Sequence, residues 1–163
     1  MSAGRSQRTW ALLAAGAAVV LIGSMFLEWY TLGLPEGVRS RGAELPTFTG
    51  FEGLERADVA IVVAATVAIV IAVAVAAGAV AGSSTLGIAL TAVSLFGLAV
   101  VVYRGVISPP GLFFLGIDFE MDVSFGWFVS FAASVLMTVA GALTYLAGPR
   151  LQFQTSEAPE SQP

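Results

Sequence analysis

Three long stretches of the chain contain no charged residue, and this feature restricts the available folds more than any other. They run from Thr9 to Leu27, from Val59 to Tyr103 and from Val123 to Pro149. A helix that crosses a membrane needs about 20 mostly apolar residues. The first and third stretches each hold one such helix, and the middle stretch is long enough for two. The sequence therefore predicts four transmembrane helices.

The composition agrees with a membrane environment. The 163 residues are 57% hydrophobic and 11% charged, whereas a soluble domain carries about 25% charged residues. The chain has too little polar surface to cover itself in water. We expect an all-α membrane protein, a four-transmembrane-helix bundle with a small extracytoplasmic loop or β cap.

The middle stretch is expected to divide at "AGSST" (81–85). Gly82 can end one helix there, and Ser83 or Ser84 can cap the next. The membrane domain then covers residues 9–148. Its expected spans are about 10–27, 59–80, 86–103 and 125–147.

Arg5 and Arg8 stand directly before the first span. A signal peptide can begin in this way, but the apolar run is long for one and no A-x-A-like cleavage site follows, so we expect an uncleaved span. The bare arginine total slightly favours the opposite orientation, yet the first helix usually dominates. We expect a multi-pass protein of the cell membrane with both termini cytoplasmic. Its parts outside the spans are residues 1–8 and a disordered tail 149–163 in the cytoplasm, and loops 28–58 and 104–124 outside.

The first apolar run ends abruptly in "FLEWY" (26–30). A glutamate is unfavourable in hydrocarbon, and Trp and Tyr concentrate at the headgroup level. Glu28, Trp29 and Tyr30 are therefore interpreted as the interfacial anchor at which the first helix leaves the membrane.

Residues 117–123 alternate apolar and acidic side chains, a period of two that predicts a strand with one wet face. Because a strand needs a partner, we expect it to pair with part of "LPTFTGF" (45–51). A calcium loop starting at Asp118 is the alternative. Its usual glycine is Val123 here and its usual glutamate is Val129, which disfavours that reading.

Small and hydroxyl residues recur inside the spans. The second span has alanine at every fourth position from Ala60 to Ala76, a spacing that serves either homodimerisation or packing within the bundle. The fourth has Ser130, Ser134 and Thr138, and the third has a similar series: Ser84, Gly87, Thr91 and Ser94. These hydroxyls either bond back to their own helix or line a solute path. The spans lack ionisable residues, so we expect packing.

Asp58 and Arg104 are the first charges met on leaving the second and third spans at the same side. In an antiparallel hairpin, residues equidistant from the turn lie at similar height. We expect Arg104 to bond Asp58, with Glu52 and Glu28 as competing partners.

Several kinds of catalytic and binding site are excluded, because the chain lacks the residues that they need. The chain has no Cys and no His, which excludes disulfides, thiol catalysis and Cys/His zinc sites. It has no phosphate-binding loop and no basic stripe for nucleic acid. We expect no enzyme activity, no cofactor and no metal. The predicted function is a non-catalytic membrane protein that acts through lipid or protein contacts, including a homo-oligomer; the alternative is a small channel, or a solute transporter or transporter subunit.

Four short motifs lie in order at the predicted outer ends of the spans. They are "MFLEWY" (25–30), "TGFEGLERADV" (49–59), "VYRGVISPPG" (102–111) and "GWF" (126–128). This set resembles that of small four-helix membrane proteins of high-GC bacteria whose activity is not characterised. The chain departs from the pattern at Glu28, where proline is usual, and at Phe51, where tryptophan is. The resemblance implies the topology but no activity, and it adds Pro109, Pro110 and Trp127 to the structural or interaction candidates.

Overall fold

The computed structural model describes residues 3–32, 47–50, 56–78, 84–107, 112–114, 117–119 and 121–148. Among these residues, four helices are long and apolar enough to cross a membrane. They are α1 (Ala3–Ser24), α3 (Arg56–Ala77), α4 (Ser84–Val102) with its continuation η1 (Tyr103–Ile107), and α5 (Phe125–Ala147). The prediction of a mostly helical fold with four such helices is confirmed.

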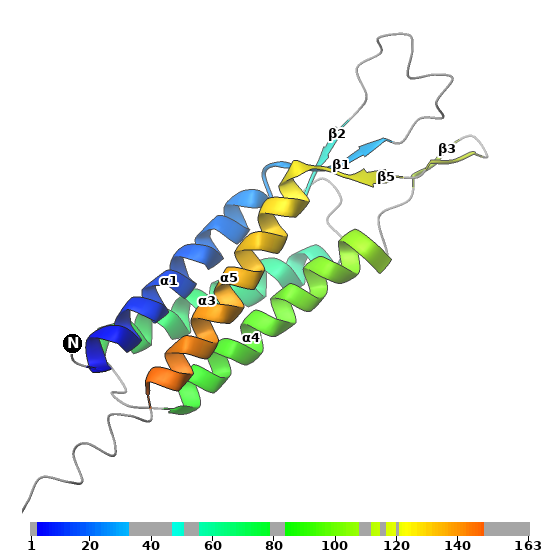
Figure 1. The fold of residues 1–163 in the computed structure, drawn as a ribbon. Helices are drawn as coiled ribbons and strands as arrows, with labels where there is room; N and C mark the ends of the chain where they lie inside the picture. Colours follow the sequence, from blue (N-terminus) through cyan, green and yellow to red (C-terminus); the bar gives the residue numbers. More distant parts are fainter. Residues whose placement is uncertain are drawn as a thin grey trace, which may run out of the picture.

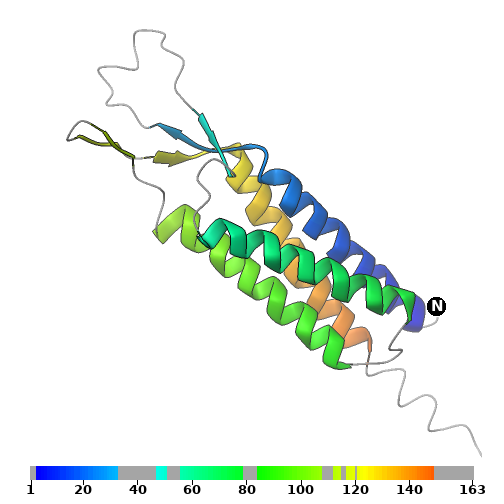
Figure 2. The ribbon, with the colours of Figure 1, turned by 180° about the vertical axis from the view of Figure 1, so that it is seen from behind.

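The helices form an elongated bundle in which successive helices run in opposite directions (Figures 1 and 2). α1 packs between α3 and α5, and α4 packs between the same two helices on the other side. The start of α1 and the end of α5 lie at one end of the bundle, which we call the terminal end. The other end carries the strands, and we call it the sheet end.

Small side chains fill the interior of the bundle, and large side chains cover its exterior. Alanines of α1 and α3 fill much of the core, among them Ala14, Ala18, Ala68 and Ala72, none of them exposed. Large apolar side chains such as Val70 and Phe96 face outward. This arrangement suits lipid, where close backbone approach drives helix association and an apolar exterior is not penalised. Of the alanine repeat in α3, Ala64, Ala68 and Ala72 are buried within the bundle.

α3 ends earlier than the sequence suggested. We expected a helix to Val80 with Gly82 as its stop, but the helix ends at Ala77. Gly78 follows with a φ of 74°, the left-handed conformation that glycine adopts without strain. Gly78, and not Gly82, therefore ends this helix.

A three-stranded sheet covers the sheet end, and its order corrects the predicted pairing. β1 (Glu28–Leu32) lies in the middle, antiparallel to both β2 (Thr47–Thr49) and β5 (Met121–Val123). β3 (Leu112–Phe114) and β4 (Ile117–Phe119) form a separate antiparallel pair. The expected extended structure in 117–123 is confirmed, except at residue 120, which lies outside the described residues. Its pairing with 45–51 is wrong, because the segment assigned to the helix exit is itself the central strand.

Candidate functional site

The main polar feature of the bundle is an ion pair at the sheet end. Arg104 donates from Nε to Oδ1 of Asp58 and from Nη2 to Oδ2, each at 3.1 Å. The two side chains are 2% and 1% exposed. This two-pronged geometry is the strongest form of the arginine–carboxylate bond. The predicted pairing of Arg104 with Asp58 is confirmed.

The pair joins two helices and is covered by β1. Asp58 lies in the first turn of α3 and Arg104 in η1. The hydroxyl of Tyr30 in β1 donates a long hydrogen bond, 3.4 Å, to the backbone oxygen of Arg104. Negative charge in a first helical turn is also favoured by the helix dipole. The ion pair thus ties α3, α4 and the sheet together at one point.

Trp29 and Tyr30 are not an interfacial anchor. Trp29 is fully buried and Tyr30 is 2% exposed, so neither side chain is available to lipid headgroups. The indole nitrogen of Trp29 donates to the backbone oxygen of Ser24 at 2.8 Å, which satisfies a carbonyl at the end of α1. The chain turns back over the helix ends here, and this turns the two aromatic residues inward. Glu28 does stay exposed, and its Oε1 accepts a hydrogen bond from the hydroxyl of Thr47 in β2 at 3.2 Å.

Arg104 lies in a short π-helix that the sequence did not predict. Trp127 of α5 donates from its indole nitrogen to the backbone oxygen of Val101 at 2.9 Å, just before this segment. A Cβ at Gly105 would overlap the Trp127 ring, so only glycine allows the indole to approach. π-turns are rare and often mark functional positions in helices. In the sequence, the available signal for this contact was a glycine in one helix and a tryptophan in another. The two residues have no fixed separation along the chain, so the signal could not be recognised.

The hydroxyl series of α5 is satisfied within the bundle. Ser130, Ser134 and Thr138 each donate to the backbone oxygen four residues earlier, at 2.8 to 2.9 Å. Ser24 and Ser130 also share a hydrogen bond of 2.6 Å between α1 and α5. Such bonds are typical of hydroxyls that pack in membrane helices. In the described part of the chain, every buried side-chain nitrogen or oxygen has a hydrogen-bond partner.

The site therefore consists of the ion pair, the aromatic residues Trp29 and Tyr30 beside it, and the π-helix η1. A carboxylate that accepts from a guanidinium through both oxygens acts as a structural fastening between the two helices. The residues that the structure describes contain no cluster of three or more His, Cys, Asp or Glu that could hold a metal. Of the remaining candidates, Glu52, Pro109 and Pro110 lie outside the described residues.

Comparison with known proteins adds no relative: no family model, no curated protein and no solved structure matches the chain.

Proposed function

We propose that this chain is a non-catalytic multi-pass protein of the cell membrane that acts through contacts of its sheet end with a protein or lipid partner. The observation that carries the proposal is the buried fastening between the helices and the sheet. Arg104, Asp58 and Tyr30 hold β1 against the ends of α3 and α4. A sheet attached in this way presents its outer face at one end of the bundle.

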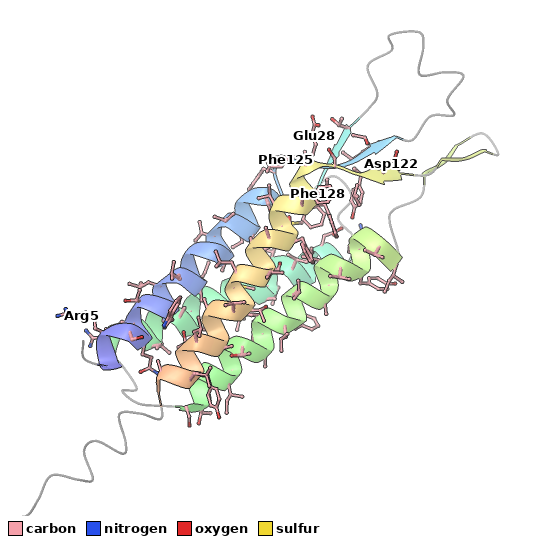
Figure 3. All side chains as sticks on the ribbon, viewed as in Figure 1. Arg5, Glu28, Asp122, Phe125 and Phe128 are labelled. Carbon is pink, nitrogen blue, oxygen red and sulfur yellow. The ribbon has the colours of Figure 1, made fainter. Side chains whose placement is uncertain are left out.

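The exterior of the helices supports residence in a membrane. Exposed side chains along all four helices are mostly valine, leucine, isoleucine and phenylalanine. In water, an apolar surface of this extent would drive association. The charged side chains that Figure 3 labels lie at the two ends, with Glu28 and Asp122 beside the sheet and Arg5 at the terminal end.

Polar side chains on the sheet support a contact role. Glu28, Thr47 and Asp122 are exposed there, and the two carboxylates lie on neighbouring strands. We propose that this end faces away from the cytoplasm, because Arg5 and Arg8 at the other end favour the cytoplasmic side. The sheet would then offer an acidic surface outside the cell.

Site-specific photocrosslinking in cells tests this role. A photoreactive amino acid replaces Thr47 on the sheet, and a matched control replaces Val70, which is exposed in the middle of α3. A partner protein is expected to crosslink at position 47 and not at position 70. If neither position captures a protein while flotation shows the chain in membranes, a protein partner at the sheet is contradicted. Equal capture at both positions would contradict a role specific to the sheet.

A further inference from the structure

An apolar groove of about 550 Å³ runs between α1 and α5 on the outside of the bundle. Leu12, Gly16 and Val20 line it from α1, and Val129, Ala132 and Leu136 line it from α5. Gly16 has open space around it, since a Cβ there would meet no atom within 4 Å. Four of its nine lining residues are glycine or alanine and the other five are leucine or valine, and such an apolar groove accepts a flexible hydrocarbon chain.

Arg5 supplies a positive charge beyond the terminal end of this groove and is not part of its lining. Arg5 precedes Leu12, Gly16 and Val20 by seven, eleven and fifteen residues, which places all four on one stripe of α1. Arg5 is exposed at the end of the helix, and Figure 3 shows it projecting from the terminal end. At 1.5 Å per residue it begins about 10 Å beyond Leu12. A long arginine side chain at such a position reaches the headgroup layer.

Arg8 is close in sequence but belongs to a different contact. Its Nη2 lies 3.2 Å from the position that a Cβ on Gly78 would take, beside the end of α3. Positive charge is favoured there by the helix dipole. A second groove, of about 470 Å³, lies between α4 and α5 near Tyr145. Among the described residues, neither α4 nor α5 has an arginine at that end of the bundle.

We propose that the α1–α5 groove binds one anionic phospholipid, with an acyl chain along Gly16 and the headgroup phosphate at Arg5. The match is one of charge and shape: an apolar groove with an arginine about 10 Å beyond its end complements a hydrocarbon chain that ends in an anion. A basic residue at a membrane surface contributes about 1 kcal/mol toward anionic lipid, which is a preference of about fivefold. The inference depends on the proposed membrane residence.

Fluorescence quenching measures this preference. Trp10, half-buried near the start of α1, is the reporter, because Trp29 and Trp127 are buried in the protein. The full chain is reconstituted in phosphatidylcholine vesicles. Two vesicle preparations are compared. One contains a minor fraction of brominated phosphatidylglycerol, and the other contains the same fraction of brominated phosphatidylcholine. In both lipids the bromine is near the headgroup end of one acyl chain. The brominated anionic lipid is expected to associate about fivefold more strongly than the neutral one.

Two arginine variants with the same net charge distinguish a specific lipid site from nonspecific electrostatic attraction to anionic lipid. Arg5→Gln is expected to reduce the relative association to about one, and Arg8→Gln is expected to retain it. Equal quenching by both lipids in the unchanged protein would overturn the site while leaving membrane residence intact. Quenching by neither lipid would overturn membrane residence, and the site with it.

Two glycine variants test the hydrocarbon part. Gly16→Leu fills the groove, whereas Gly23→Leu adds the same side chain in open space that is not part of the groove lining. The first is expected to abolish the preference and the second to preserve it. Because the chain has no cysteine, Gly16→Cys gives a clean test for a second copy as the occupant. Rapid disulfide dimerisation through this position in vesicles would overturn the lipid assignment.

Discussion

Among the charged side chains in the described part of the bundle, Arg104 and Asp58 are buried. Removal of two ions from water is unfavourable, and their two-pronged bond offsets much of that penalty. The net contribution of such a pair to stability is therefore small, although the loss of one partner leaves an uncompensated buried charge. Arg104 is itself part of the π-helix η1, and its backbone oxygen accepts the hydrogen bond from Tyr30.

Arg104→Gln and Asp58→Asn are each expected to lower the free energy of unfolding by about 3–5 kcal/mol. The double variant Arg104→Met with Asp58→Leu is expected to recover most of this loss, since it leaves no buried charge. Unfolding in detergent micelles measures each variant. Asp122→Asn, at an exposed carboxylate, serves as control and is expected to stay within about 0.5 kcal/mol. Additive losses in the double variant would contradict direct pairing.

Gly105→Ala is expected to destabilise the protein by about 1–3 kcal/mol, because the added methyl overlaps the Trp127 indole. Gly16→Ala, in open space, is expected to be neutral or to stabilise by up to about 1 kcal/mol through helix propensity. The same micelle unfolding assay compares the two variants. Trp127→Phe in the Gly105→Ala background is expected to restore part of the loss. A Gly105→Ala protein as stable as the original would show that the indole can move aside.

The sequence was informative about the ion pair and misleading about the aromatic residues beside it. Distance from a helical turn is enough to bring Asp58 and Arg104 to the same height. A tryptophan and a tyrosine at the end of a span look the same whether they face lipid or the protein. What decides between the two is the direction of the chain after Leu27, which depends on contacts with strand β5, more than 90 residues later.

At the scale of elements, the short β1 strand organises the sheet end. It pairs on one side with β2 and on the other with β5, and the backbone N–H of Ser124 extends this pairing by donating to Trp29 O at 2.7 Å. Sequence alternation predicted β5 because acidic and apolar residues alternate there. It did not predict β1, where "EWYTL" follows an apolar run without a turn signal. The sequence did not predict the π-helix η1, because no residue pattern distinguishes it from the α-helix that it continues.

The strand register gives a direct test. Thr31 and Asp122 are opposite each other in the β1–β5 pair, and opposed residues of antiparallel strands lie about 4.5–5.5 Å apart at Cα, within disulfide reach. The double variant Thr31→Cys with Asp122→Cys is expected to form an intramolecular disulfide under mild oxidation. The control pair Phe48→Cys with Asp122→Cys spans the two outer strands and is expected to stay reduced. Non-reducing gel mobility reports both, and the opposite pattern would support the direct pairing first expected.

For the whole molecule, the even number of described helices places the start of α1 and the end of α5 at one end of the bundle. The number of helices followed from the charge-free stretches, because bilayer thickness fixes how many residues a span needs. Which end faces the cytoplasm depends on the arginines that flank the charge-free stretches, and fusions to a periplasmic reporter test it.

Alkaline phosphatase fused after Gly42 is expected to be active, and the same enzyme fused after Ser83 is expected to be inactive. The enzyme folds only outside the cytoplasm, because it requires disulfides. Activity is measured in intact cells and corrected for the amount of each fusion. A reversed pattern would invert the orientation, and activity at both sites would contradict the number of spans.

The central position of β1 also sets an order of assembly during synthesis. Its neighbour β5 directly precedes α5, the last described helix, so the ribosome has made most of the chain before the sheet can close. Until then Trp29 and Tyr30 lack part of their cover, and the carbonyl of Trp29 lacks its Ser124 partner. A chain that stops before β5 would carry an unfinished sheet end, and its uncovered aromatic rings are a feature that cellular quality control would recognise.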